Sequence, residues 1–302
     1  MLARLQQRIL FGFVVAICAW GLLWWRWSPA LAVAGMVLLL LGHTLVLGLE
    51  CVAVGVANRR DPAPAPQALQ LLRAWGQETL MALRVFCWRQ PFRPDAVPDY
   101  LPTNGSAQGR QGVVLLHGLV CNRGFWAPWM TELRRRGVPC VAVNLEPVFA
   151  ASIDDYVPQV EAAVAQVAAA TGRPPLLLCH SMGGLAARAW LRWAGDARRV
   201  RRIVTIGSPH HGTALAAFSH TGNGLQMRLD SAWLQALAQT ESTERRALFS
   251  CWYSNCDQIV FPASTATLAG ADSYFVPGLP HVALAFHPPL MAAVLDEIAP
   301  RR

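Results

Sequence analysis

A serine between small residues marks the most reactive stretch of the chain. The segment CHSMG at 179–183 follows an apolar run at 176–178, and the residues after it recur with the spacing of a helix. A strand, a sharp turn and a helix would lift Ser181 Oγ clear of a sheet, where it could attack a substrate. The pattern departs from G-x-S-x-G at its first position, where Cys179 adds a small side chain. The sequence therefore predicts a nucleophile elbow at Ser181.

Backbone amides beside this turn predict a site for negative charge. Met182 begins the predicted helix, so its N–H has no partner inside that helix. We expect a second N–H from Leu119, because His117 and Gly118 turn the chain sharply before it. Together the two amides would stabilise an oxyanion. His117, Gly118 and His180 are expected to line the substrate site, although His117 could instead only support its loop.

An acid is expected after a late strand. Asp257 follows the apolar stretch 248–253 and precedes Ile-Val-Phe-Pro, so its carboxylate can lie at the carboxyl end of the sheet and orient an imidazole. Asp230 and Asp272 compete less well, since the first lies in an insertion and the second begins a strand. We therefore predict Asp257 as the acid.

The general base should come last in the chain. His281 lies in a loop after the final predicted strand and before a helix, from which it could reach Ser181. His287, just before two prolines, is the alternative. The order Ser181, Asp257, His281 is that of a nucleophile, an acid and a base in one triad.

Strands and helices alternate from Gly112 onward. Short apolar runs predict strands at 113–116, 138–144, 176–178, 200–206, 248–253 and 273–276. Helical spacing predicts helices at 131–136, 156–170 and 283–298. Apolar strands covered by helices indicate an α/β fold with a mostly parallel sheet that is buried on both faces. Ligands would then bind at the carboxyl ends of the strands.

The apolar excess of the chain lies at its start. Of the 302 residues, 54% are hydrophobic, and neither 9–25 nor 30–49 contains a charge. Each run approaches the roughly 20 residues that a membrane-spanning helix needs. We therefore predict a membrane anchor over 1–60 with transmembrane helices at about 9–27 and 30–57. The alternative is that the first run is the core of a signal peptide, with Ala30-Leu31-Ala32 resembling a cleavage site.

Basic residues near the two runs predict their orientation. Arg4 and Arg8 precede the first run, Arg26 alone lies between them, and Arg59 and Arg60 follow the second. Because positive charge accumulates on the cytoplasmic side, both ends should face the cytoplasm. This predicts a multi-pass protein of a bacterial inner membrane with a cytoplasmic catalytic domain, while the periplasmic side stays open.

Cysteine usage agrees with that compartment. Six of the eight cysteines lie beyond the two predicted transmembrane helices, and a reducing compartment would keep them as thiols. Cys251 and Cys256 could instead pair in an oxidising one.

The segment between anchor and catalytic domain, 61–111, begins with a stiff Pro-rich linker. Residues 67–92 then have the pattern of an amphipathic helix, which could lie on the bilayer or pack on the catalytic domain. The predicted catalytic domain covers 112–302. An insertion at about 214–246 carries apolar residues suited to a lid or a fixed cap, namely Leu225, Leu229, Trp233, Leu234 and Leu237.

The charge pattern excludes some function classes. The net charge of +8 comes from arginine, without lysine, and is spread along the chain, which does not favour nucleic-acid binding. No His, Cys or Asp cluster has the spacing of a zinc site, so we predict no metal and no cofactor. The sequence gives no indication of oligomeric state.

From about Gly112 to the end, the chain resembles the α/β-hydrolase superfamily and within it the bacterial triacylglycerol lipases. Three strings carry the resemblance: His-Gly-Leu at 117–119, His-Ser-Met-Gly-Gly at 180–184 and Ile-Gly-Ser-Pro-His-His-Gly-Thr at 206–213. The resemblance implies a lipase or esterase with Ser181, Asp257 and His281 as triad. Leu119 and Met182 match the oxyanion hole, and the segment after the third string matches the lid.

The expected chemistry is the hydrolysis of carboxylic esters through an acyl-enzyme. Lipid-like esters are the expected substrates, since the anchor holds the site near a bilayer. An acyltransferase with the same triad, a non-catalytic membrane scaffold that binds lipid or protein, and amide hydrolysis are the alternatives.

Overall fold

Six parallel strands form the sheet at the centre of the fold. The protein was analysed as a computed structural model that describes residues 1–149 and 151–299. The strands are β1 (Val113–Leu116), β2 (Cys140–Val143), β3 (Leu176–His180), β4 (Arg202–Ile206), β5 (Phe249–Tyr253) and β6 (Asp272–Phe275). Their spatial order is β2-β1-β3-β4-β5-β6, and every neighbouring pair is parallel. The predicted α/β class with a parallel sheet is confirmed.

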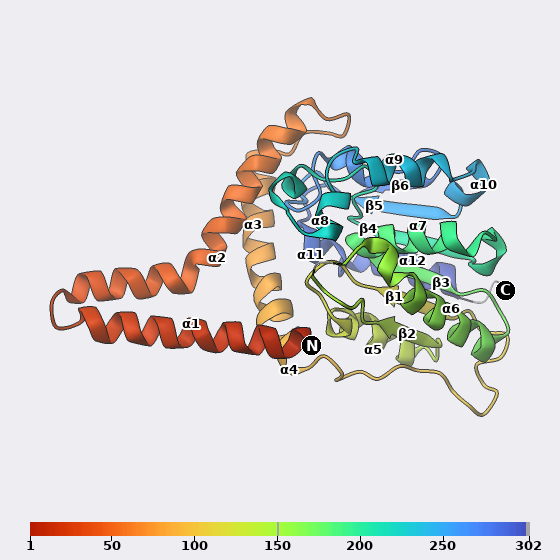
Figure 1. The fold of residues 1–302 in the computed structure, drawn as a ribbon, viewed down its shortest axis with the longest axis horizontal. Helices are drawn as coiled ribbons and strands as arrows, with labels where there is room; N and C mark the ends of the chain where they lie inside the picture. Colours follow the sequence, from red (N-terminus) through yellow and green to blue (C-terminus); the bar gives the residue numbers. More distant parts are fainter. Residues whose placement is uncertain (150, 300–302) are drawn as a thin grey trace.

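Helices cover both faces of the sheet (Figure 1). On one face lie α6 (Val157–Thr171) and α7 (Met182–Ala194), and on the other lie α5 (Ala127–Arg135) and α12 (Pro288–Ile298). Strand β1 divides its side chains between the two: Val114 and Leu116 point to the first core, and Val113 and Leu115 point to the second. Burial on both faces explains why β1 and β3 at the centre of the sheet lack acidic and basic residues apart from His180.

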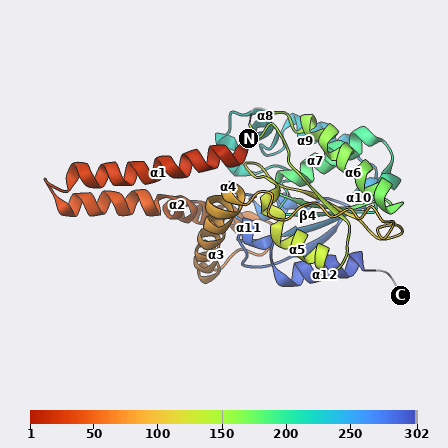
Figure 2. The ribbon, with the colours of Figure 1, turned by 90° about the horizontal axis from the view of Figure 1, so that it is seen from below.

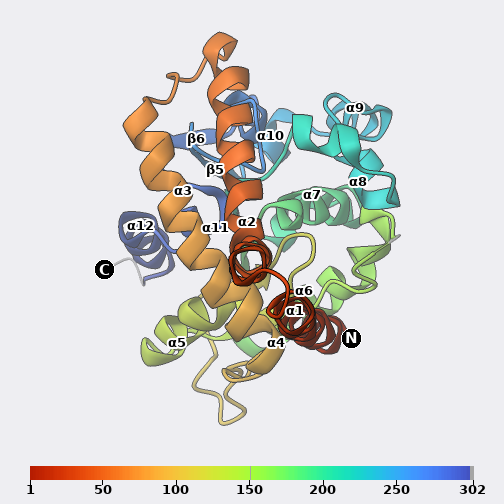
Figure 3. The same cartoon turned by 90° about the vertical axis from the view of Figure 1, so that its left-hand side faces the viewer.

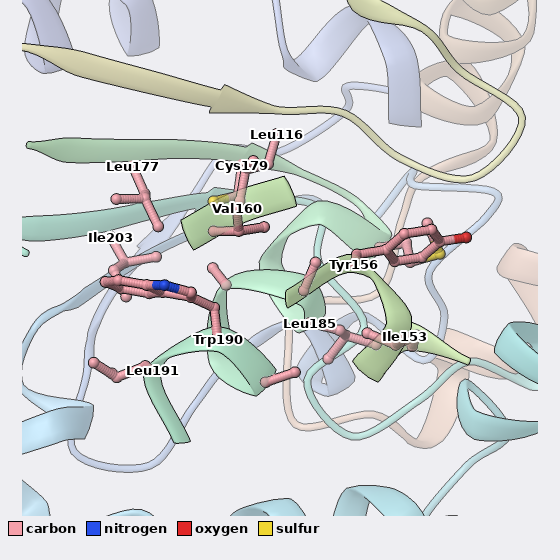
Figure 4. Packing of buried hydrophobic residues seen from close by; sticks show 14 of the residues in the cluster. Leu116, Ile153, Tyr156, Val160, Leu177, Cys179, Leu185, Trp190, Leu191 and Ile203 are labelled. Atoms are coloured by element: carbon pink, nitrogen blue, oxygen red, sulfur yellow. The ribbon is translucent and has the colours of Figure 1, made fainter. Parts of the chain in front are cut away.

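The buried indole of Trp190 fills much of the core under α7. Figure 4 shows it among apolar side chains of β3, β4 and α6. Its ring nitrogen Nε1 donates a hydrogen bond of 2.8 Å to Glu161 Oε2, so the one polar atom of the ring has a partner. The ring is therefore buried without an unpaired donor.

Replacing Trp190 by alanine should lower the free energy of unfolding by about 3–5 kcal/mol, because a large cavity forms. Trp193→Ala is the matched control, since Trp193 lies on the same helix but is 60% exposed. Denaturant or thermal unfolding in detergent measures both. Equal losses in the two variants would contradict the packing described.

An antiparallel pair of long helices precedes the sheet. Helix α1 covers Leu2–Trp24 and α2 covers Pro29–Ala57, followed by the short η1 (Asn58–Arg60). Both are long and apolar enough to cross a membrane, with mean hydropathies of 1.7 and 2.3, and 0% and 6% of their most apolar windows are buried. The pair projects from the domain as a hairpin (Figures 1 and 2). The apolar windows of the two helices are thus almost entirely uncovered.

A helical segment lies between the hairpin and the sheet. It consists of α3 (Ala68–Ala82), a π-helical stretch (Leu83–Arg89) and α4 (Gln90–Phe92). Figure 3, seen from the hairpin side, shows α3 running across the front of the domain. Its inner side is buried at Ala74 and Glu78. The segment predicted as one amphipathic helix therefore packs on the domain, and its outer side stays uncovered.

The last predicted helix is wrong in one respect. Residues 283–298 form no single helix, because α11 (His281–Leu284) ends before α12 (Pro288–Ile298) begins. Pro288 and Pro289 cause the break, since proline lacks an N–H and restricts the residue before it. His281 is accordingly the first residue of α11.

The insertion is also divided more finely than predicted. It contains η6 (Ala214–Phe218), α8 (Gly222–Gln226), α9 (Ala232–Gln239) and α10 (Thr243–Arg246). Leu234 and Leu237 are buried, whereas Leu225 and Leu229 are exposed and lie before the break at Asp230, whose φ is 47°. The apolar residues of the insertion therefore do not share one helix face. The remaining short helices are η3 (Arg123–Trp126), η4 (Ile153–Tyr156), η5 (Ala197–Arg199) and η7 (Ala263–Ala266).

Candidate active site

Ser181 occupies the turn between β3 and α7. Its φ of 55° and ψ of −129° are rare for a residue with a side chain and cost strain energy. The turn is held because Ser181 N donates to Ile206 O on the neighbouring strand, at 2.9 Å. The next helix passes so close to β1 that a Cβ on Gly183 would lie 2.3 Å from Leu116 O. Only glycine fits there, which explains the glycine two residues after the serine.

The loop after β1 reaches the serine. A Cβ on Gly118 would lie 2.8 Å from Ser181 Cβ and 3.3 Å from its Oγ. The two predicted oxyanion donors flank this contact in sequence: Leu119 follows Gly118, and Met182 is the first residue of α7. Both N–H groups thus belong to residues adjoining the contact between this loop and the turn.

His281 and Asp257 form a buried pair. His281 Nδ1 lies 2.8 Å from Asp257 Oδ2. The other carboxylate oxygen, Oδ1, accepts hydrogen bonds from Ile259 N at 2.9 Å and Val260 N at 2.8 Å. A carboxylate that accepts these bonds leaves the proton on His281 Nδ1, so that Nε2 can act as a base.

The charge of the pair sets the basicity of the imidazole. Burial alone lowers the pKa of His281, but the negative charge and hydrogen bond of Asp257 outweigh it, so that this pKa lies above the ordinary value. A raised pKa makes His281 a better proton acceptor during attack by a hydroxyl.

Gly207, at the end of β4, connects the serine to this pair. Its φ is +54°, and a Cβ there would lie 2.7 Å from Asp257 Oδ2 and 3.1 Å from His281 Nδ1. The residue before it, Ile206, accepts the hydrogen bond from Ser181 N. The His281 ring also lies 4.5 Å from the ring of His180, which adjoins Ser181. Of the residues predicted as a triad, Asp257 and His281 are therefore in contact, and Ser181 lies near them through Gly207 and His180 at the ends of β3 and β4.

The two other predicted histidines support the loops. His117 Nε2 accepts from Leu145 N at 3.1 Å, so Nδ1 carries the proton and donates to Gly118 O at 2.9 Å. Burial lowers the pKa of His117 to about 4, so it is neutral at pH 7. His180 Nε2 lies 3.2 Å from His281 O, and burial lowers the pKa of His180 well below its ordinary value. Both rings are deeply buried, and their ring nitrogens contact backbone atoms of the neighbouring loops.

The alternative acids and base lie elsewhere. Asp272 begins β6 and forms an exposed ion pair with Arg202. Asp230 is exposed on the insertion, and His287 precedes α12 beyond the end of α11. The partner that the structure gives His281 is Asp257.

The cysteines carry no crosslink in the part of the chain that the structure describes. All eight are free thiols, including Cys251 and Cys256. Within residues 1–149 and 151–299, no group of three or more His, Cys, Asp or Glu side chains could hold a metal ion.

Two residues at this site were missed in the sequence analysis. Glu78 of α3 and Gln258, next to Asp257, bond the chain around His281. Glu78 is the only acidic residue between 62 and 94, in a helix that otherwise carries arginine. An isolated carboxylate is a weak signal of a specific role, and the sequence contains no comparable signal for Gln258.

Gly207→Ala should reduce the reaction of Ser181 with a fluorophosphonate by about 100-fold, because the new methyl group displaces the His281–Asp257 pair. Gly195→Ala is the control: its φ is +72°, and no atom lies within 4 Å of its Cβ position. Both variants should lose roughly 1–2 kcal/mol of stability from the left-handed backbone. A control that loses as much labelling as Gly207→Ala would argue against this geometry.

Comparison with known proteins identifies the fold. A family model described as a PGAP1-like alpha/beta domain matches residues 161–268, which include Ser181 and Asp257. The mature form of Bacillus licheniformis lipase BlEst2 has a TM-score of 0.56 and 15% identity, over 64% of this chain and 93% of that one. Aspergillus fumigatus lipase B also has a TM-score of 0.56, with 19% identity over 68% of this chain and 56% of that one. No curated protein sequence matches the chain. The predicted α/β-hydrolase fold is confirmed.

Proposed function

We propose that this chain is a membrane-anchored serine hydrolase that cleaves lipid-like carboxylic esters. The observation that carries the proposal is the strained Ser181 turn beside the buried His281–Asp257 pair. A hydroxyl, an imidazole and a carboxylate in this order serve acyl transfer. The lipases with the same fold agree with this chemistry.

The mechanism follows from these groups. His281 Nε2 takes the proton of Ser181 Oγ as the oxygen attacks the ester carbonyl, and Asp257 stabilises the resulting imidazolium. The N–H groups of Leu119 and Met182 stabilise the tetrahedral oxyanion. Collapse expels the alcohol, which takes the proton from His281. Water then attacks the acyl-enzyme, with His281 as base, and releases the acid.

The surroundings of the site favour an apolar substrate. Ser181 is only 8% exposed, and Phe125 stacks on His180 at 4.5 Å. The ring of Phe286 lies 5.1 Å from that of Phe125. Phe125 itself is fully buried, so these rings pack around His180 and make the surroundings of the turn apolar, which suits a substrate with an acyl chain.

The proposed anchor is the hairpin α1–α2. The outer side of α3 and the start of the π-helical stretch continue its apolar surface through four exposed leucines: Leu69, Leu72, Leu80 and Leu83. Arg73 and Arg84 are exposed on the same helical segment, where the one carboxylate, Glu78, is buried. Leucines flanked by arginines suit the boundary of a bilayer with anionic headgroups. The carboxyl edge of the sheet would thereby face the membrane.

Ser181→Ala should abolish fluorophosphonate labelling and lower ester hydrolysis by a factor on the order of 10⁶, because the nucleophile is lost. The substrates are p-nitrophenyl esters of graded chain length and a diacylglycerol in mixed micelles. Ser208→Ala, another buried serine near the turn, is the control and should stay within a few-fold of the unaltered protein.

Two results would count against the proposal. A folded protein that hydrolyses no ester of any chain length would exclude the substrate class. Product that forms only when an alcohol acceptor is added would identify an acyltransferase.

Anchoring should keep the chain in the membrane fraction after an alkaline carbonate wash, with release only by detergent.

The arginines at both ends of the hairpin predict that a reporter fused after Arg302 is active in the cytoplasm. Phosphatase and fluorescent-protein fusions measure the side. Activity of the periplasmic reporter alone would reverse the predicted orientation, and release by carbonate would disprove the anchor.

A further inference from the structure

The backbone around His281 is held on several sides. Its N–H donates to Gln258 Oε1 at 3.1 Å, and its carbonyl oxygen lies 3.2 Å from His180 Nε2. The next residue, Val282, donates its N–H to Glu78 Oε1 at 2.8 Å, although the two are 204 residues apart in sequence. The position of the imidazole is thus fixed partly by a side chain that precedes the sheet.

Glu78 is a buried carboxylate that accepts several hydrogen bonds. The residue is 2% exposed, and its carboxylate also accepts from Ala283 N at 3.2 Å and Gln258 Nε2 at 2.8 Å. Burial raises the pKa of Glu78, while these N–H donors favour its ionised form. Every contact is from a donor, as an ionised carboxylate requires.

The Glu78–Gln258 bond fixes the direction of an amide. Because Gln258 Nε2 donates to Glu78, its Oε1 points the other way and accepts from His281 N. Gln258 directly follows Asp257, so the same bond restrains the loop that carries the acid. Glu78 therefore acts on both partners of the serine without touching the reacting atoms.

Helix α3 carries Glu78 on one side and contacts the hairpin on another. Trp75 Nε1 donates to Thr44 O of α2 at 2.7 Å. A Cβ on Gly55 would lie 2.9 Å from Leu71 Cδ1, so the two helices approach closely. The proposed membrane anchor, α3 and the histidine loop form one continuous series of contacts.

We propose that Glu78 is a positioning residue that holds His281 in its reactive orientation and connects the geometry of the triad to the membrane anchor. This inference rests on the proposed serine-hydrolase function. Any buried carboxylate needs donors, but those of Glu78 come from the residues directly after His281 and from the residue directly after Asp257, so their placement carries the inference.

Several charged or titratable groups face His281. They are Asp257 on the loop after β5, Glu78 on α3, Glu50 on α2 and His180 on β3. His281 must be neutral to accept the serine proton, so reactivity rises as pH increases through its pKa. A plot of labelling rate against pH should therefore have a rising part at low pH, the acid limb, and a plateau at higher pH. Removing the negative charge of Glu78 lowers the pKa of His281 and should shift the acid limb to lower pH.

The test compares Glu78→Gln, Glu78→Asp and Glu241→Gln in the full chain, purified in detergent. Glu241 is the control: it is a buried carboxylate like Glu78, but its partner is Arg188 and not the chain around His281. The second-order rate of fluorophosphonate labelling is measured from pH 5 to 9, with thermal unfolding on the same samples.

Glu78→Gln should lower the plateau rate about tenfold and move the acid limb to lower pH. Glu78→Asp keeps the charge but is one methylene shorter, so it should lower the plateau and leave the limb in place. Glu241→Gln should lose stability while its limb and plateau stay those of the unaltered protein. The aspartate variant gives a readout even where glutamine prevents folding.

Unaltered plateau and limb in Glu78→Gln would overturn the inference. So would a loss of rate in Glu241→Gln equal to that in Glu78→Gln, since it would indicate a general effect of destabilisation. An unaltered protein that is labelled but hydrolyses no ester would defeat the proposed substrate class only, and the comparison of rates still decides the role of Glu78. Complete failure of labelling would defeat both.

Discussion

The strained backbone at Ser181 is the constraint on which the rest of the structure depends. A serine with positive φ persists only where its surroundings fix it, because the strain costs about 1–3 kcal/mol. The turn lies between β3, paired on both sides within the sheet, and α7, whose first ten residues are all buried. Gly118 lets the loop after β1 approach the turn, Gly183 lets α7 pass the end of β1, and Gly207 leaves room for the His281–Asp257 pair. The sheet and the helix hold the turn, and the glycines leave room for it.

A buried ion pair connects the far side of α7 to the insertion. Arg188 Nε donates to Glu241 Oε1 at 2.7 Å, and its Nη1 donates to His210 O at 2.8 Å. Both charged side chains are almost fully buried, so desolvation offsets much of their attraction. The bonds nevertheless specify where the insertion and the loop after β4 meet the helix. The insertion thus rests on the same helix that follows the nucleophile, and part of it is fixed rather than free to move.

Local sequence patterns predicted the features that depend on local physics. The elbow at Ser181 and the six strands follow from apolar runs and small residues, and the pairing of Asp257 with His281 follows from their positions after late strands. The break before Pro288 was missed because the helical spacing beyond it continued the pattern before it. Glu78 could not be assigned, since its partner Val282 is 204 residues away and only the tertiary fold brings them together. Contacts of this kind leave almost no trace in a single sequence.

The position of α3 explains why an amphipathic pattern alone could not decide between bilayer and domain. One helix has several faces, and here its inner side buries Glu78, a second side meets α2 through Trp75, and the outer side exposes leucines such as Leu80. A helical moment reports only that apolar residues are unevenly distributed, not which surface covers them. If the hairpin spans a bilayer, the outer leucines lie at its boundary while the inner carboxylate lies against the histidine loop. The helix that meets the lipid would then be the one that orients the base, so a displacement of α3 at the membrane surface would reach His281 through two hydrogen-bonded N–H groups.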